Sequence, residues 1–176
     1  MISYVITGPE SAGKSELSTQ LAKHFGGLVV QEYARHYVES LPGSYTFEDV
    51  ELIARQQILD YNRVRNRAGR KQAVFFDTFL IITKVWFEEV FYCCPHWLHQ
   101  AIQTYKPDFA LLCAPDLPWE ADGVRENPHI RDYLFGKYAR ELEFYSIPYG
   151  IVRGVGDDRL QKAISIIQEM HQPASF

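Results

Sequence analysis

Residues 8–15 constrain the fold of this chain more than any other part of its sequence. They read Gly-Pro-Glu-Ser-Ala-Gly-Lys-Ser, a complete G-x-x-x-x-G-K-[ST] phosphate-binding motif. An apolar run at residues 2–6 precedes the motif, and a helical pattern at residues 16–25 follows it. In this setting the glycines let the loop curl until its N–H groups face phosphate oxygens, and the helix adds the positive end of its dipole. The motif predicts a nucleoside triphosphate site; a Gly-rich turn before a structural helix is the alternative.

The side chains of the motif have predicted roles in such a site. Lys14 is expected to reach the β- and γ-phosphates, and the Ser15 hydroxyl is expected to hold Mg²⁺. The expected cofactors are therefore ATP and Mg²⁺, and no short motif in the chain distinguishes ATP from GTP. The nucleotide-binding residues predicted from the motif are Gly8, Glu10, Ser11, Ala12, Gly13, Lys14 and Ser15.

Composition and charge bear on the class of protein. The chain has 176 residues, of which 47% are hydrophobic and 23% charged, and these values predict one soluble globular domain over residues 1–176. The net charge of −4 argues against a nucleic-acid partner, and the basic residues at 63–71 are interpreted as a solvated helix end. The cysteines lack C-x-x-C spacing, and no leader or apolar run of transmembrane length is found, so a cytoplasmic protein with reduced thiols is expected. The oligomeric state stays open.

Short apolar runs alternate with helical patterns along the chain. Because the runs are nearly continuous in apolar residues, they are typical of parallel strands covered on both faces. Strands are expected at residues 2–7, 28–32, 73–77, 109–113 and 149–153, and helices at residues 16–25, 46–68, 79–92, 95–105, 130–145 and 157–171. The alternation predicts a three-layer α/β fold with a five-stranded parallel sheet. In such sheets ligands bind beyond the carboxyl ends of the strands.

Two acidic residues are placed where the predicted second and third strands end. Asp77 closes the run 73–77, and a carboxylate there is typical of a Mg²⁺ ligand for a bound nucleotide; the alternative is a residue of a strand-end turn. Glu32 closes the run 28–32 and is expected to accept a proton from a substrate hydroxyl; the alternative is an acid that stabilises a helix N-terminus. Either Glu32 or Asp77 is the predicted base.

The segment after the predicted fourth strand is broken by proline and glycine and carries arginine. It runs through residues 115–125 and ends in Arg125, and Arg131 follows shortly. A mobile segment with arginines is expected to close over the phosphates, exclude water and neutralise charge in the transition state. For both arginines the alternative is an exposed position at the start of a helix.

Aromatic side chains near the predicted strand ends are candidates for stacking on a planar substrate ring. The three candidates are Tyr33, Trp86 and Trp119. A position in the core is the alternative, above all for Trp86, which lies in an apolar helical pattern.

Five segments follow one another in an order that is shared with a known family. They are residues 8–15, Glu-Tyr-Ala-Arg at 32–35, Phe-Asp-Thr at 76–78, Lys-Val-Trp at 84–86 and Leu-Pro-Trp-Glu-Ala-Asp-Gly-Val-Arg at 117–125. Together they resemble the ribosylnicotinamide kinase domain of bacterial bifunctional NAD-biosynthesis regulators and its stand-alone relatives. The resemblance implies a P-loop nucleoside-kinase-like fold with a short lid. It also implies ATP-dependent phosphorylation of the 5′-hydroxyl of nicotinamide riboside to nicotinamide mononucleotide.

The resemblance and the residue patterns together give a full set of expected site residues. The small-molecule partner is a nucleoside, and the chain is expected to perform the kinase step alone, because it carries no H-x-G-H nucleotidyltransferase signature. The expected catalytic residues are Lys14, Glu32, Asp77, Arg125 and Arg131, with Ser15 and Asp77 on the metal. The expected substrate-binding residues are Glu32, Tyr33, Arg35, Trp86, Trp119 and Asp122.

The chain departs from the family pattern at one position. Relatives commonly carry Asp-Thr-Asp after the third strand, whereas this chain has Asp-Thr-Phe at residues 77–79. Two alternatives therefore stand beside the nicotinamide riboside kinase. One is a kinase for another nucleoside or small metabolite, and the other is a catalytically silent ATP-binding regulatory module, for which Phe79 is the main support. A guanine-reading switch protein is disfavoured because no N-K-x-D motif is present.

Overall fold

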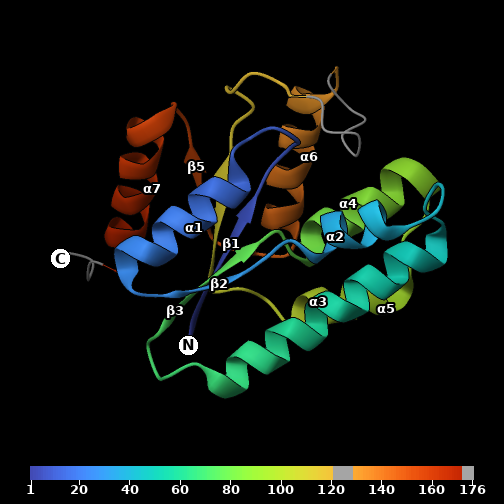
Figure 1. Ribbon diagram of the computed structural model, residues 1–176, viewed down its shortest axis with the longest axis horizontal. Helices are drawn as coiled ribbons and strands as arrows, with labels where there is room; N and C mark the ends of the chain where they lie inside the picture. Colours follow the sequence, from blue (N-terminus) through green and yellow to red (C-terminus); the bar gives the residue numbers. More distant parts are fainter. Residues whose placement is uncertain (121–128, 172–176) are drawn as a thin grey trace.

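The sheet at the centre of the molecule is parallel, as predicted. The computed structural model describes residues 1–120 and 129–171. Within these residues five strands pair in the order β2-β3-β1-β4-β5, and every neighbouring pair is parallel (Figure 1). They are β1 (Ile2–Thr7), β2 (Leu28–Val30), β3 (Ala73–Asp77), β4 (Phe109–Cys113) and β5 (Tyr149–Val152). Strand β2 ends two residues earlier than predicted, so the expectation that Glu32 closes this strand is wrong.

Seven helices lie in the described residues, and six of them begin and end within two residues of the predicted positions. They are α1 (Lys14–Phe25), α2 (Tyr33–Ser40), α3 (Phe47–Arg67), α4 (Leu80–Phe91), α5 (His96–Thr104), α6 (Arg131–Phe144) and α7 (Gly156–His171). The sequence analysis did not predict α2, which has only eight residues and no fully buried side chain. No helix in the described residues is both long and apolar enough to cross a lipid bilayer.

The strands separate two apolar cores by the alternation of their side chains. Tyr4 and Ile6 of β1 pack with α1 and α7, whereas Val5 between them packs with α3, α4, α5 and α6. Strands β3 and β4 alternate in the same way, since Phe75 and Leu111 belong to the core that contains Tyr4 and Ile6. Figure 1 shows α1 and α7 on one side of the sheet and α3, α4 and α5 on the other. Because both faces are buried, the strands are apolar nearly throughout, which is why a parallel sheet was predictable.

Polar contacts fix the long helix α3 and tie α2 to it. The Thr46 hydroxyl accepts a hydrogen bond from the Asp49 N–H at 3.3 Å, and the Asp49 carboxylate accepts one from the Thr46 N–H at 2.7 Å. This is a capping box, and it stabilises the helix start predicted at Thr46. The Tyr37 hydroxyl of α2 donates to the other Asp49 oxygen at 2.7 Å. Helix α2, which carries Arg35, is thereby held in a fixed place.

A row of charged side chains joins α4 to α6. Lys84 is only 4% exposed and pairs with Glu88 at 2.5 Å and with Glu141 at 2.8 Å. Lys137 of α6 pairs with Glu88 at 3.1 Å and with Glu89 at 2.5 Å. The carboxylates raise the pKa of Lys84 against the opposing effect of burial. Each charge in this row has an opposite neighbour, which offsets the cost of burying it.

Candidate active site

The phosphate-binding loop lies at the carboxyl end of β1 and leads into α1. Gly8 has a φ of +138°, and a Cβ atom there would come within 2.5 Å of the Cys113 carbonyl oxygen at the end of β4. Gly13 has a φ of +68° and occupies the N-cap position of α1. Both conformations favour glycine, and at Gly8 the approach to the backbone of β4 also leaves no room for a side chain. The two glycines therefore allow the loop to curl against the sheet edge.

Lys14 and Ser15, the two polar residues that end the motif, both line a cavity above the loop. The Lys14 ammonium donates a hydrogen bond to the Pro9 carbonyl oxygen at 2.8 Å, across the loop itself. A phosphate bound to Lys14 has to replace this bond or share the ammonium with it. The structure thus brings the predicted cation to the cavity and shows what it contacts there.

Asp77 ends β3 next to β1, and its carboxylate is 2% exposed. Neither carboxylate oxygen has a hydrogen-bonding partner of good geometry among the described residues. Burial raises the pKa of Asp77 to about 6, and the charge of Glu32 raises it further, whereas Ser15, Lys14 and Arg35 lower it. A buried carboxylate without a partner is costly to keep ionised. The Asp77 carboxylate is therefore a candidate to bind a group that the described residues do not supply.

The residues present fit a magnesium ion that arrives with a nucleotide. Mg²⁺ prefers oxygen ligands and is usually bound through one or two carboxylates together with substrate phosphates and water. Asp77 and the Ser15 hydroxyl offer such oxygens beside the phosphate loop. In the described part of the chain, no group of three or more acidic, cysteine or histidine side chains forms a metal cage. The donor set therefore suits a metal held jointly by protein and phosphates.

The residue after Asp77 has an unusual backbone conformation. Thr78 has a φ of +66° and is 5% exposed, and its N–H donates to the Ile6 carbonyl oxygen at 3.1 Å. A β-branched residue in the left-handed region is strained, and such strain is concentrated at functional sites. The bond to β1 holds the turn that follows Asp77 at the sheet edge.

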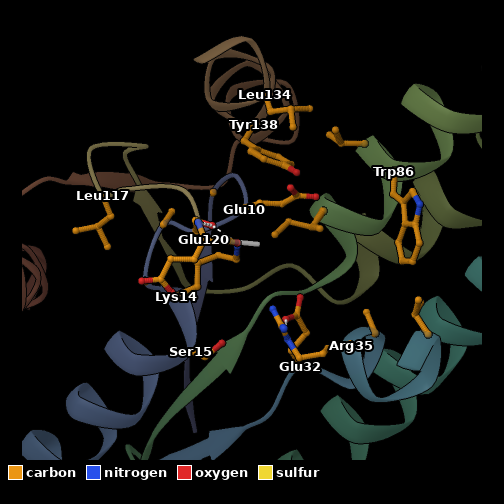
Figure 2. Close-up of a pocket in the computed structure, with 18 of the residues that line it drawn as sticks. Glu10, Lys14, Ser15, Glu32, Arg35, Trp86, Leu117, Glu120, Leu134 and Tyr138 are labelled. Atoms are coloured by element: carbon orange, nitrogen blue, oxygen red, sulfur yellow. Dashed lines mark hydrogen bonds and ion pairs between the residues drawn. The ribbon is translucent and has the colours of Figure 1, made fainter. Parts of the chain in front are cut away.

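Glu32 is not part of β2; it lies at the N-cap position of α2. Its side chain makes no capping hydrogen bond. It instead forms an ion pair with Arg35 at 3.6 Å, and both residues line the cavity (Figure 2). The predicted acid therefore lies beside the phosphate loop, but a helix start places it there rather than a strand end.

The cavity beside the loop has a volume of about 500 Å³ and extends from the phosphate loop to α4 and α6. Among the described residues, five carboxylates line it against two cations, Lys14 and Arg35, so the wall formed by these residues is acidic. These carboxylates are Glu10, Glu16, Glu32, Glu89 and Glu120. A cavity of this size is typical of small-molecule sites.

Aromatic rings form part of the cavity wall. Trp86 of α4 and Tyr45 meet edge to face, with ring centroids 4.8 Å apart. Tyr138 of α6 lies across from them, close to Glu10 (Figure 2). Burial raises the pKa of Tyr138 above its usual range, and the carboxylates around the cavity add to this effect. Tyr138 therefore stays a neutral phenol at neutral pH.

The structure separates the remaining predicted residues into three groups. Tyr33 and Trp119 are absent from the cavity lining, and Tyr33 packs on Tyr37 with ring centroids 5.8 Å apart. Arg131 donates to two backbone carbonyl oxygens, of Leu117 at 2.9 Å and of Ser11 at 3.2 Å. Arg125 and Asp122 lie outside the described residues, as does the part of the predicted mobile segment from residue 121 to residue 125.

Phe79, at the position where the sequence departs from the family pattern, lies in the apolar core. It is 5% exposed and stacks on Tyr61 and Phe76, with ring centroids 5.6 and 5.4 Å away. It does not line the cavity. The aromatic side chain therefore does not obstruct the candidate site.

The sequence-based prediction missed four residues of this region, namely Tyr45, Glu89, Tyr138 and Arg159. The first three line the cavity but lie in patterns that also serve the core or the surface, so nothing local distinguishes them. Arg159 is 5% exposed and contacts the phosphate loop from α7. A signal for it was present, because a cation in the first turn of a helix opposes the helix dipole.

Comparisons with known proteins agree with this geometry. Residues 3–159 match a family described as AAA domain. A structure of NadR in complex with NR is similar over 99% of the chain, with 21% identity and a TM-score of 0.76. A structure of NadR in complex with NAD and AMP-PNP is similar over 99% of the chain, with 20% identity and the same TM-score. The chain spans about half the length of these two NadR chains, 54% and 52%.

A third likeness extends over the full length of both partners. Deoxyadenosine kinase from M. mycoides covers 96% of this chain and 100% of its own, with 13% identity and a TM-score of 0.65. No curated protein sequence matches the chain. The likenesses confirm the predicted P-loop nucleoside-kinase-like fold, and the NadR structures agree with the resemblance carried by the five sequence segments.

Proposed function

The chain belongs to the AAA domain family, and on that premise we propose that it transfers the γ-phosphoryl group of ATP to the 5′-hydroxyl of nicotinamide riboside. One observation carries the choice of acceptor. The cavity next to the phosphate loop is acidic and aromatic at once. Nicotinamide riboside has a planar pyridinium ring with a positive charge, which carboxylates attract and aromatic faces bind by cation–π interaction. An uncharged nucleoside gains much less from such a wall.

The proposed mechanism assigns each end of the cavity to one substrate. Lys14 and the loop N–H groups bind the ATP phosphates, and Trp86, Tyr45 and Tyr138 surround the acceptor ring. Mg²⁺ bound with the nucleotide supplies charge neutralisation on the phosphates, and Ser15 and Asp77 are the residues that would hold it. The likeness to NadR in complex with NR and in complex with NAD and AMP-PNP supports this arrangement.

Glu32 is the proposed base, because it lines the cavity, whereas Asp77 is almost fully buried and is assigned to the metal. Glu32 accepts the proton of the 5′-hydroxyl as the oxygen bonds to the γ-phosphorus. The bond from that phosphorus to the β–γ bridging oxygen breaks, and ADP leaves with the bonding electrons. Arg35 keeps the Glu32 carboxylate oriented through their ion pair. The lid roles of Arg125 and Arg131 stay predictions.

A coupled ADP-release assay tests the acceptor directly. With ATP and Mg²⁺, we expect turnover with nicotinamide riboside at a kcat/KM about tenfold or more above that with its reduced form, which has the same shape but no ring charge. Uridine, cytidine and adenosine complete the panel. Turnover with an ordinary nucleoside and none with nicotinamide riboside would show that the acceptor is that nucleoside and not nicotinamide riboside. Nucleotide binding without turnover on any acceptor would favour the regulatory alternative.

Replacing Trp86 tests the aromatic wall. Trp86→Leu keeps an apolar side chain but removes the ring face, so the KM for nicotinamide riboside should rise about 5- to 30-fold. The KM for ATP should stay within about twofold, because Trp86 belongs to the end of the cavity remote from Lys14. Trp97→Leu is the matched control, since Trp97 does not line the cavity and its ring packs under Arg55 at 4.3 Å. Equal changes in both variants would argue against a contact between Trp86 and the acceptor.

A further inference from the structure

Arg159 makes four hydrogen bonds at the rear of the phosphate-binding loop. It is 5% exposed and reaches from the first turn of α7. One guanidinium nitrogen donates to the Asp116 carboxylate at 2.7 Å and to the Gly154 carbonyl oxygen at 2.8 Å. The other donates to the carbonyl oxygens of Ala12 at 2.7 Å and of Ala114 at 3.1 Å. A single side chain thus joins the phosphate loop to the segments that follow β4 and β5.

A second guanidinium, that of Arg131, binds the carbonyl group of the preceding peptide unit in the loop. Arg131 donates to the Ser11 carbonyl oxygen at 3.2 Å and to the Leu117 carbonyl oxygen at 2.9 Å. Two successive carbonyl groups of the loop, those of Ser11 and Ala12, are therefore held by two different helices, α6 and α7. Neither bond is part of a helix or a strand.

The direction of a carbonyl determines the direction of the next N–H group. A trans peptide is planar, and its N–H points opposite to its C=O. When Arg159 holds the Ala12 carbonyl at the rear of the loop, the Gly13 N–H must point to the other side. In the same way the bond from Arg131 to Ser11 directs the Ala12 N–H. Ala12 and Gly13 both line the cavity, whereas Arg159 and Arg131 do not.

We propose that Arg159 is a positioning residue that presents the Gly13 N–H group to the phosphates of a bound nucleotide by holding the Ala12 carbonyl from behind. The guanidinium also places a positive charge at the rear of the peptide unit, which reinforces the pull of the loop on an anion. The proposal rests on the nucleotide site of the proposed function and not on the identity of the acceptor. Arg131 acts on the Ala12 N–H in the same manner.

A purely structural role for Arg159 makes different predictions from a positioning role. The ion pair with Asp116 is one link between α7 and the sheet, and Asp116 also accepts a bond from the Gly154 N–H at 2.8 Å. If Arg159 served only to hold α7, Asp116→Asn should impair the protein much as Arg159→Met does. A positioning role requires the contact with Ala12, which Asp116→Asn leaves in place.

The test measures binding of ATP and of inorganic tripolyphosphate by calorimetry, without an acceptor, together with the melting temperature. In Arg159→Met we expect both ligands to bind about 10- to 100-fold more weakly, because small misplacements of contacting groups cost this much. Arg159→Lys keeps the charge but loses the fork of donors, so we expect an intermediate loss. The exposed control Arg140→Met should stay within about threefold of the unaltered protein. Asp116→Asn should lower the melting temperature, because it removes the charge that faces the buried guanidinium, but its affinities should also stay within about threefold.

The outcomes separate this proposal from the choice of acceptor. Arg159→Met with unchanged affinity for both ligands overturns it, whatever acceptor the enzyme uses. A loss for ATP but not for tripolyphosphate also overturns it, since the effect would then lie on the base or sugar. If Arg159→Met melts below the assay temperature, Arg159→Lys decides, and a Lys variant with full affinity contradicts the proposal. Failure of nicotinamide riboside as an acceptor leaves these binding results unaffected.

Discussion

Asp77→Asn is expected to stop phosphoryl transfer while making the unliganded protein more stable at neutral pH. The loss of activity should be about 100- to 1,000-fold in kcat, since an amide is a poor ligand for the magnesium that accompanies the nucleotide. The gain in stability follows from burial, because the carboxylate is 2% exposed and has no hydrogen-bonding partner of good geometry among the described residues. An amide at this position removes the cost of a buried negative charge.

The stability effect of Asp77 has a defined dependence on pH. Folding raises the pKa of this carboxyl from 3.8 to about 6. Below about pH 4 it is protonated in both states and contributes nothing, whereas between pH 4 and 6 the folded state binds more protons, so stability falls as the pH rises. Above pH 6 the full cost of roughly 3 kcal/mol applies, because each pKa unit is worth about 1.4 kcal/mol.

Urea denaturation without nucleotide or metal, at pH 4 and at pH 8, measures this effect. Asp77→Asn should exceed the unaltered protein by about 2–3 kcal/mol at pH 8 and match it near pH 4. Asp60→Asn is a control at a partly exposed carboxylate that pairs with Arg63 at 3.1 Å and accepts a hydrogen bond from Gln56 at 2.9 Å, and it should change stability by less than about 1 kcal/mol. An Asp77→Asn protein that is fully active, or less stable at pH 8, would contradict the assignment.

Lys14→Met should lower kcat by about 100- to 1,000-fold in the same ADP-release assay, the cost typical of losing one preorganised group that stabilises transition-state charge. The variant keeps the length of the side chain but cannot neutralise the phosphates. It also removes the bond at 2.8 Å that spans the loop from Lys14 to the Pro9 carbonyl oxygen. ATP affinity should fall less than kcat, since the loop N–H groups still contact the phosphates.

Lys23→Met is the matched control for Lys14→Met, because Lys23 is exposed near the end of the same helix. It should leave kcat within about twofold, as expected for an exposed charge. A Lys14→Met protein that retains more than about a tenth of the activity would show that phosphoryl transfer does not use this motif in the usual way.

The parts of the molecule that the sequence predicted well are those specified by neighbouring residues. The phosphate loop is one, since all its elements fall within eight residues, and the five strands are another, because two covered faces leave a nearly continuous apolar run. Helix α2 escaped prediction because its eight residues carry only a short apolar pattern, and the position of Glu32 was misjudged with it. A helix of this kind is fixed by partners distant in sequence, here by the bond from Tyr37 to Asp49.

The far wall of the cavity was harder to predict for a related reason. Trp86 was identified through a motif, but Tyr45, Glu89 and Tyr138 come from three separate segments that meet only after folding. Phe79 shows the same limit at the edge of the site. It follows Asp77 by two residues in the sequence, but its side chain packs in the aromatic cluster of the core. Proximity along the chain after a strand does not determine which side of the sheet edge a residue faces.

The row of charges between α4 and α6 also bears on how this protein can change in evolution. An apolar contact tolerates the exchange of one residue for another of similar size, and the cost is gradual. In the row formed by Lys84, Glu88, Glu141, Lys137 and Glu89, the loss of one member leaves a partly buried charge without its partner. Substitutions at these positions should therefore be accepted in compensating pairs. The charged residues of α4 and α6 should vary together in sequence, while the other surface residues of the two helices vary independently.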